Sequence, residues 1–198
     1  MTAARAPQQE RSRLTREALL SATVDMLATH GWSATTVSVV AEAAGVSRGA
    51  AQHHFPTRES LITAVLEQMF QEMTDEADRE LVDLPEGPER IAIVVDRAVG
   101  IYTGTPFKAA LQVWAAAASD ENLRQAILPL EAKLGRSAYK LTLKALDPDG
   151  VHPDAKRLSQ LTLDLARGLG LADTLSDDSA RRAVVVGTWV DQLKAALA

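Results

Sequence analysis

Apolar side chains recur at helical spacing in the N-terminal part of the chain. The first run predicts a helix from about Thr15 to Thr29, and His30–Gly31 should end it because glycine readily adopts the conformation that closes a helix. A second helix should follow Thr35 or Thr36, whose hydroxyl can cap its first turn, and should end at Gly45. Its apolar face has the spacing i, i+3, i+4 and i+7, at Val37, Val40, Ala41 and Ala44.

A third short helix follows directly. It should begin near Arg48 with Ser47 as its cap, and it should end at Pro56. Two short helices joined by a three-residue turn that contains glycine, "GVS", have the geometry of a helix-turn-helix, in which the second helix enters the major groove of DNA. A tight corner in a purely structural domain would show the same spacing, so the pattern alone leaves both interpretations open.

The rest of the chain also shows helical patterns separated by clear breaks. The first expected helix spans residues 59–82, and the next runs from Pro88 to just before Gly104. A further helix contains Phe107 and Trp114, and the one after it is capped by Ser119 and Asp120 and is kinked or restarted at Pro129. The last two expected helices span residues 154–172 and 177–196. We therefore predict an all-α fold. Residues 1–58 should form an N-terminal three-helix domain, and residues 59–198 a larger helical domain.

Composition agrees with helices and excludes several classes of protein. Hydrophobic residues make up 46% of the chain but aromatic residues only 4%, and alanine and leucine favour helix over strand. The chain has no cysteine, so disulfides and thiolate metal sites are excluded. The N-terminal residues lack the apolar segment of a secretion signal, and no run approaches the roughly eighteen apolar residues of a membrane span. We expect a soluble, cytoplasmic protein with no membrane partner.

The net charge of −5 is unevenly distributed. Residues 1–60 carry six Lys/Arg against five Asp/Glu, giving +1, whereas residues 61–198 carry fifteen against twenty-one, giving −6. Four arginines precede the first apolar face, namely Arg5, Arg11, Arg13 and Arg16. The acidic residues in this segment are Glu10 and Glu17. A basic arm that leads into a helix is typical of nucleic-acid binding, although a solvated terminus would have the same composition.

Motifs of enzymes and metal sites are missing from the sequence. There is no nucleophile elbow or phosphate loop, and Gly168–Gly170 lies inside a leucine stripe without the third glycine of a dinucleotide motif. His53 and His54 are adjacent, so on a helix they point about 100° apart, and neither has a nearby third ligand. His30 and His152 are expected at helix ends or in loops. We predict no catalytic residue, no metal site and no cofactor.

Residues 19–61, "LLSATVDMLATHGWSATTVSVVAEAAGVSRGAAQHHFPTRESL", resemble the N-terminal DNA-binding domain of the TetR family of transcriptional regulators. The shared features are an apolar first helix, a glycine, a threonine before the second helix, "A-x-x-A-G-V-S", and "H-F-P-x-[KR]-x-x-L". The resemblance implies a homodimer with two DNA-binding heads on double-stranded DNA. It also implies a long fourth helix and a larger helical domain that binds a small molecule.

The family's DNA contacts can be carried over position by position. In the family, threonine at the start of the second helix contacts phosphate, the serine that caps the third helix lies near the backbone, and the basic residue that begins the fourth helix meets phosphate. The residues that match DNA-contacting positions are Thr36, Ser47, Arg48, Ala50, Gln52, His53 and Arg58. This chain departs from the family at Gln52, where tyrosine usually binds phosphate, and at Ala51, where a larger apolar residue is usual. Glutamine can pair with adenine in the major groove, so Gln52 either reads a base or marks a lost anchor.

The last two expected helices carry the candidate dimer interface. In the family, a four-helix bundle from these two helices of each subunit is the common dimer form. The candidate residues lie on two apolar stripes, Leu158, Leu161, Leu165 and Leu169 in the first helix and Ala183, Val186, Val190 and Leu193 in the second. Each stripe has the spacing of a face that packs into its own subunit, and the sequence does not separate the two interpretations.

Apolar side chains from the middle helices are candidates for an effector pocket. They are Met69, Phe70, Met73, Tyr102, Phe107, Leu111, Trp114 and Tyr139. Any one of them is an ordinary core residue when taken singly, but together they indicate a hydrophobic or amphipathic small-molecule effector. The predicted protein is a regulator, most simply a repressor, that binds a palindromic operator as a dimer and is released by this effector. The alternative is a ligand-sensing or protein-interaction module whose head no longer binds DNA specifically.

Overall fold

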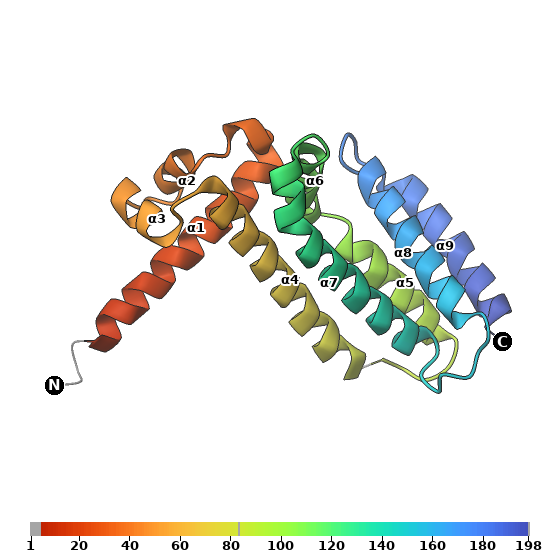
Figure 1. The fold of residues 1–198 in the computed structure, drawn as a ribbon. Coiled ribbons are helices and arrows are strands. Elements are labelled where there is room, and N and C mark those ends of the chain that lie inside the picture. Colours follow the sequence, from red (N-terminus) through yellow and green to blue (C-terminus); the bar gives the residue numbers. More distant parts are fainter. Residues whose placement is uncertain (1–4, 83, 198) are drawn as a thin grey trace. The chain divides into compact units, whose positions relative to one another are not determined.

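The computed structural model describes the backbone of residues 5–82 and 84–197, and the side chains of residues 8–75, 79 and 84–197. Every regular element in this part of the chain is an α-helix, so the predicted all-α fold is confirmed. In chain order (Figure 1), the helices are α1 (Arg5–Ala34), α2 (Val37–Ala43), α3 (Arg48–His54), α4 (Arg58–Val82), α5 (Glu89–Ile101), α6 (Thr105–Ala117), α7 (Glu121–Leu146), α8 (Ala155–Ala172) and α9 (Ser179–Ala196). Within these residues no helix has the length and apolar character that a membrane span requires.

Helix α1 is longer than its apolar pattern predicts. It begins at Arg5 instead of near Thr15, and it continues beyond Gly31 to Ala34. Gly31 is nevertheless the point at which the helix bends, with φ 77° and ψ −179°, a conformation that is essentially confined to glycine. The predicted stop is therefore a kink. Helix α7 likewise runs through Pro129 as one element.

The chain divides into two packing units, which we call unit 1 and unit 2. Unit 1 contains the residues up to Met69 together with Lys108–Leu130, and unit 2 contains Phe70–Phe107 together with the residues from Glu131 onward. Helices α4, α6 and α7 contribute residues to both units. The boundary between residues 58 and 59 that the sequence suggested for two domains stays a prediction.

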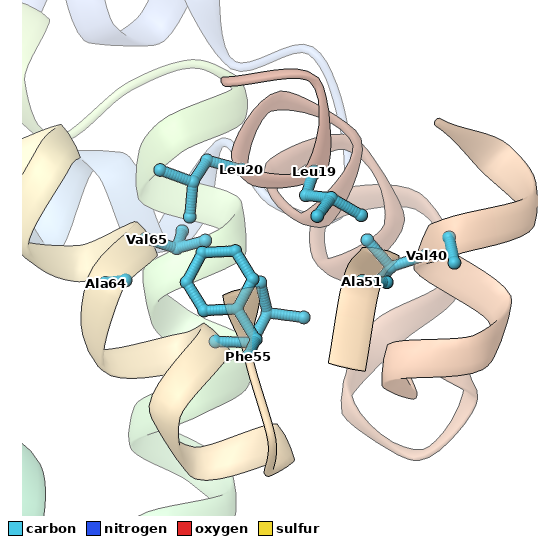
Figure 2. Close-up of a cluster of buried hydrophobic side chains, with 9 residues drawn as sticks. Leu19, Leu20, Val40, Ala51, Phe55, Ala64 and Val65 are labelled. Carbon is cyan, nitrogen blue, oxygen red and sulfur yellow. The ribbon is translucent and has the colours of Figure 1, made fainter. Parts of the chain in front are cut away.

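Unit 1 is built around two apolar clusters. The first, which we call the head cluster, joins α1, α2, α3 and the start of α4, and Figure 2 shows the Phe55 ring among its side chains. Its buried members are Leu19, Leu20, Val40, Ala41, Ala51, Phe55, Leu61, Ala64 and Val65. The second joins Leu27 of α1 and Ile62 of α4 to Val113 of α6 and Ile127 of α7. Residues from α6 and α7 are therefore part of the same packing unit as the three N-terminal helices.

Unit 2 has its core where α5 packs against α8 and α9, and these three helices lie side by side in Figure 1. Val95 of α5, Leu158 of α8 and Leu193 of α9 belong to one buried cluster. Trp189 of α9 also donates its indole N–H to the Thr162 hydroxyl of α8, at 3.0 Å. Buried apolar area and a partly buried hydrogen bond therefore hold α8 and α9 together within one chain.

Gly170 is the point of closest backbone approach in unit 2. A Cβ atom at this position would overlap the Tyr102 carbonyl oxygen and come within 2.9 Å of Phe107 Cε1. The Tyr102 and Phe107 rings themselves meet edge to face, with centroids 5.5 Å apart. The glycine is therefore required by packing, because α8 can approach the end of α5 only without a side chain at residue 170.

We expect Gly170→Ala to lower the free energy of unfolding by about 2 kcal/mol, since the core cannot accommodate the added methyl group without backbone movement. In a chain of this size the loss lowers Tm by roughly 6 °C, measurable by circular dichroism. Gly135→Ala is the matched control, because a Cβ on this α7 glycine meets nothing within 4 Å and alanine is the better helix former. Equal melting temperatures for the two variants would contradict the close approach at Gly170.

Candidate nucleic-acid interface

The segment from Thr36 to His54 forms two short helices joined by a tight turn. At the end of α2, Val46 N–H donates to the Ala41 carbonyl at 2.9 Å and Gly45 N–H to the Glu42 carbonyl at 3.1 Å. This pair of bonds is a Schellman closure, which needs a left-handed residue, and Gly45 supplies it with φ 65°. The predicted end of the second helix at Gly45 is confirmed, and so is the helix-turn-helix arrangement.

Both helices have the side-chain caps that the sequence predicted. The Thr36 hydroxyl accepts from Val39 N–H at 3.3 Å, and the Ser47 hydroxyl accepts from Ala50 N–H at 3.2 Å. Each hydroxyl satisfies one N–H group that a helix start leaves without a partner. The caps also place both hydroxyls beside helix N-termini, where backbone N–H groups and the helix dipole favour anions such as phosphate.

Helix α3 has one buried face and one exposed face. Ala51 is fully buried in the head cluster, and Phe55 follows one turn later at 4% exposure. On the opposite side four of the predicted DNA-contacting residues are exposed, namely Ser47, Arg48, Gln52 and His53, and Ala50 is half-buried. The packing thus presents a polar surface made of arginine, glutamine and histidine.

The departure from the family at Ala51 has a structural explanation. Ala51 lies between α3 and the helices that carry Leu19 and Val40, in the interior of the head cluster (Figure 2). A small side chain allows the short helix to approach α1 and α2 closely, and the Phe55 ring supplies apolar volume next to it. The neighbouring Gln52 is exposed on the other side of α3.

The two adjacent histidines have different environments. The His53 ring is exposed, whereas His54 is half-buried, and the two rings meet edge to face at 5.8 Å. The His54 ring centroid lies 6.2 Å from that of Phe55. Burial, and then the charges of His53 and Arg16, hold the pKa of His54 below its ordinary value. His54 is therefore a packing residue, and His53 belongs to the exposed surface. Across the described residues, His, Cys, Asp and Glu side chains form no cluster of three that suits a metal ion.

The basic N-terminal residues are part of α1, and some of their charge is already balanced. Arg13 forms ion pairs with Glu10 at 2.5 Å and Glu17 at 2.6 Å along the helix surface. The Arg16 guanidinium lies over the Phe55 ring, 5.6 Å from its centroid. Arg11 is exposed, while the side chain of Arg5 lies outside the described residues. The predicted basic arm is therefore a helical extension with internal ion pairs.

Arg58 is half-buried within unit 1. The resemblance to the TetR family predicted that this residue contacts phosphate. Its guanidinium lies over the Trp32 ring, 3.7 Å from the ring centroid, and Nη2 donates a hydrogen bond to the Trp32 carbonyl oxygen. Burial lowers the pKa of Arg58 from its ordinary value. The structure thus gives Arg58 an intramolecular partner that sequence reasoning missed, and its contact with phosphate stays a prediction.

The candidate effector residues are distributed over both packing units. Met69, Leu111 and Trp114 belong to unit 1, whereas Phe70, Met73, Tyr102, Phe107 and Tyr139 belong to unit 2. Within unit 2, the Arg167 guanidinium lies 5.1 Å from the Tyr102 ring centroid and donates to the Tyr102 hydroxyl at 3.2 Å. Burial raises the pKa of Tyr102. A pocket formed by all eight residues stays a prediction.

Half of the candidate dimer residues are core residues of a single chain. Leu158, Leu169, Val190 and Leu193 are at most 9% exposed, because they face the apolar interior of unit 2 and are not available to a partner. Of the other four, Leu161 and Ala183 are exposed and Leu165 and Val186 are half-buried. The predicted interface residues therefore lie on two different faces of α8 and α9, one turned to the core and one turned to solvent.

Leu161 belongs to a group of exposed apolar residues and glycines near these helices, of which Leu171, Leu175 and Val184 were not identified from the sequence. We call this set the α8–α9 outer face, and it consists of Leu161, Gly168 and Leu171 of α8, Leu175 in the following turn, and Val184 and Gly187 of α9. Leu175 is 95% exposed and Val184 is 70% exposed. Spacing along α8 puts residues 161, 168 and 171 on one side of the helix, a signal that was available once residue 158 was assigned to the core.

Comparison with known proteins agrees with the geometry of this segment. The family model described as "Bacterial regulatory proteins, tetR family" matches residues 19–65, which include α2, the turn and α3. Residues 19–65 therefore form a TetR-family helix-turn-helix domain. Its helix-turn-helix is the DNA-binding element of that family, as the resemblance of residues 19–61 predicted.

Similarity to individual proteins extends over nearly the whole chain. The HTH-type transcriptional regulator CymR of Pseudomonas putida is 29% identical over 182 residues, covering 91% of this chain and 90% of CymR. A putative TetR-family transcriptional regulator from Rhodococcus sp. has a TM-score of 0.69 at 19% identity, covering 93% and 99% of the two chains. FadR from Bacillus subtilis, solved with stearoyl-CoA, has a TM-score of 0.68 at 15% identity, covering 89% and 96%. The two solved structures support the fold of this chain.

Proposed function

We propose that this protein is a TetR-family repressor that binds a palindromic operator as a homodimer and leaves it when a small hydrophobic effector binds. The observation that carries the proposal is the two-sided character of α3. Its apolar side is buried in the head cluster, and its other side exposes Arg48, Gln52 and His53. A helix held in this way can enter the major groove without losing the packing that orients it.

The exposed groups suit different parts of a DNA duplex. The capped N-termini at Thr36 and Ser47 are proposed to contact phosphates, which position a protein on DNA without reading its sequence. Arg48, Gln52 and His53, together with the small Ala50, are proposed to face the bases. Arginine pairs with guanine and glutamine with adenine through two hydrogen bonds in the major groove, so these two residues should carry most of the sequence preference.

The α8–α9 outer face is the proposed dimer interface. It places leucine and valine at strongly exposed positions beside Gly168 and Gly187, at which an added Cβ would meet nothing within 4 Å. Large exposed apolar side chains next to small residues allow helices of two subunits to approach and exclude water. Two heads joined in this way would address two half-sites of an inverted repeat.

Val184→Glu should raise the dimer dissociation constant at least about 100-fold, since a dimer would bury the new carboxylate against apolar side chains. Sedimentation equilibrium measures this constant. Val151→Glu is the matched control, because Val151 is 79% exposed but lies in the loop before α8. A wild-type chain that sediments as a monomer, or a Val184→Glu variant that dimerises like wild type, would exclude this interface.

The effector is proposed to bind among apolar side chains that include the Tyr102–Phe107 pair of unit 2. FadR of Bacillus subtilis, solved with stearoyl-CoA, is a precedent in this fold for a ligand that carries a long acyl chain. In a thermal-shift screen of hydrophobic compounds, an effector should raise Tm in proportion to ligand occupancy and weaken operator binding. The proposed release mechanism fails if every stabilising compound leaves operator affinity unchanged.

DNA binding should be specific and should depend on Arg48. In gel-shift titrations with a duplex that the wild-type chain selects from a random-sequence pool, we expect a nanomolar dissociation constant. Arg48→Ala should weaken this binding by about 10- to 100-fold, a loss of about 1–3 kcal/mol, and relax the preference at one base pair.

Two variants control this experiment. Arg136→Ala removes an exposed arginine of α7 and should leave the affinity at the wild-type value. Ser47→Asp keeps a side-chain cap for α3, so stability should persist, but its negative charge should repel phosphate and weaken binding. Failure of the wild-type chain to shift any duplex at low salt would favour the alternative of a ligand-sensing module whose head does not bind DNA.

A further inference from the structure

Arg58 is the first residue of α4, and only Pro56 and Thr57 separate it from Phe55, the C-cap residue of α3. Its guanidinium covers the Trp32 ring at 3.7 Å from the centroid and donates to the Trp32 carbonyl oxygen. The Nε atom is buried and has no hydrogen-bond partner among the described residues. A guanidinium stacked on one side and hydrogen-bonded at its edge is held in one orientation.

Trp32 is itself fixed by its surroundings in unit 1. It follows Gly31, whose φ of 77° bends α1, and it packs against the cluster that contains Leu27, Ile62 and Val113. A Cβ on Gly31 would come within 3.1 Å of the Gln112 side-chain oxygen, so the kink lies close to α6. The ring that Arg58 covers is therefore held by α1, α4 and α6 together.

This geometry limits the donors that Arg58 can offer to a phosphate. Its Nε is buried and Nη2 already donates to a backbone carbonyl, so a phosphate oxygen would have to be met through the remaining N–H groups at the far edge of the guanidinium. Leaving that carbonyl and ring would cost a charge-assisted hydrogen bond and a cation–π contact. The same contacts instead tie the start of α4, and with it the end of α3, to the kink of α1.

We propose that Arg58 is a positioning residue, which orients α3 by clamping the start of α4 onto Trp32 and does not serve as a phosphate anchor. The proposal rests on the proposed DNA-binding function for its effect on affinity, but the clamp itself can be tested without DNA. Arg58→Lys is informative, because lysine keeps the positive charge that attracts a phosphate. It loses the planar guanidinium, which stacks on a ring and donates several hydrogen bonds in a fixed geometry.

Thermal unfolding of the full chain tests the clamp directly. Arg58→Met and Trp32→Leu should each lower Tm, and the double variant should lose about 3 °C less than the sum of the single losses, because both changes remove the same contact. Trp32→Leu combined with Arg136→Met, an exposed arginine of α7, should be additive. Additive losses for Arg58 and Trp32 would show that no clamp exists, whatever the protein does with DNA.

DNA binding then separates positioning from phosphate contact. With the duplex selected by the wild-type chain, we expect both Arg58→Lys and Arg58→Met to weaken specific binding about 10-fold. Affinity for a random duplex and the slope of log Kd against log salt should stay at wild-type values. Trp32→Phe, which keeps a ring, should retain specific binding, whereas Trp32→Leu should lose it as the Arg58 variants do.

The opposite result has an equally clear pattern. If Arg58 contacts phosphate, Arg58→Lys keeps wild-type affinity, and Arg58→Met weakens specific and random duplexes alike with a salt slope lower by about 1. That pattern would overturn the proposal. If no duplex is bound by the wild-type chain, the DNA-binding function fails, and the unfolding cycle still decides whether the clamp is present.

Discussion

The arrangement of the DNA-binding head depends on the burial of one face of α3. A helix of seven residues is not stable by itself in water, so its position must come from tertiary packing and from its ends. Ala51 and Phe55 supply the packing, Gly45 the turn before it, and Ser47 the cap. Because this face is apolar and continuous with α1 and α2, the opposite face is free to carry residues chosen for DNA. The same constraint explains the small residue at position 51, where close approach matters more than side-chain volume.

The helix caps, turn and helix end in the head could be predicted from sequence, because each depends on only a few neighbouring residues. A left-handed glycine at Gly45, a hydroxyl cap at Ser47 and a break at Pro56 each act on their immediate neighbours. Long-range packing has no such signal. The apolar face of α6 is evident from its sequence, but nothing in it indicates that Val113 packs with Leu27 of α1. The start of α1 was also misplaced, since its first turns are polar and carry no apolar periodicity.

Candidate residues could be assigned to a surface only where their helix has a single apolar face. In α3 one face is apolar and the polar residues fall on the other, so Arg48, Gln52 and His53 lie on the exposed side. In α8 the apolar residues encircle more of the helix. Leu158 enters the core while Leu161, three residues later, is 46% exposed. Periodicity identifies apolar positions, but it does not tell which of two apolar surfaces each position belongs to.

Few positive charges in the head are available to DNA, and this limits how the protein can achieve affinity. Arg48 is the one Lys or Arg between residues 37 and 54, Arg13 is paired with two glutamates, and Arg58 stacks on Trp32. Phosphate neutralisation supplies most of the non-specific affinity of DNA-binding proteins, so a single head with these charges should bind weakly. Joining two heads makes the second contact intramolecular and multiplies the affinity without new charges. Dimerisation through α8 and α9 would therefore be a requirement for operator binding. An effector that alters the spacing of the two heads would then need to cancel only the increase in DNA affinity that joining the heads provides.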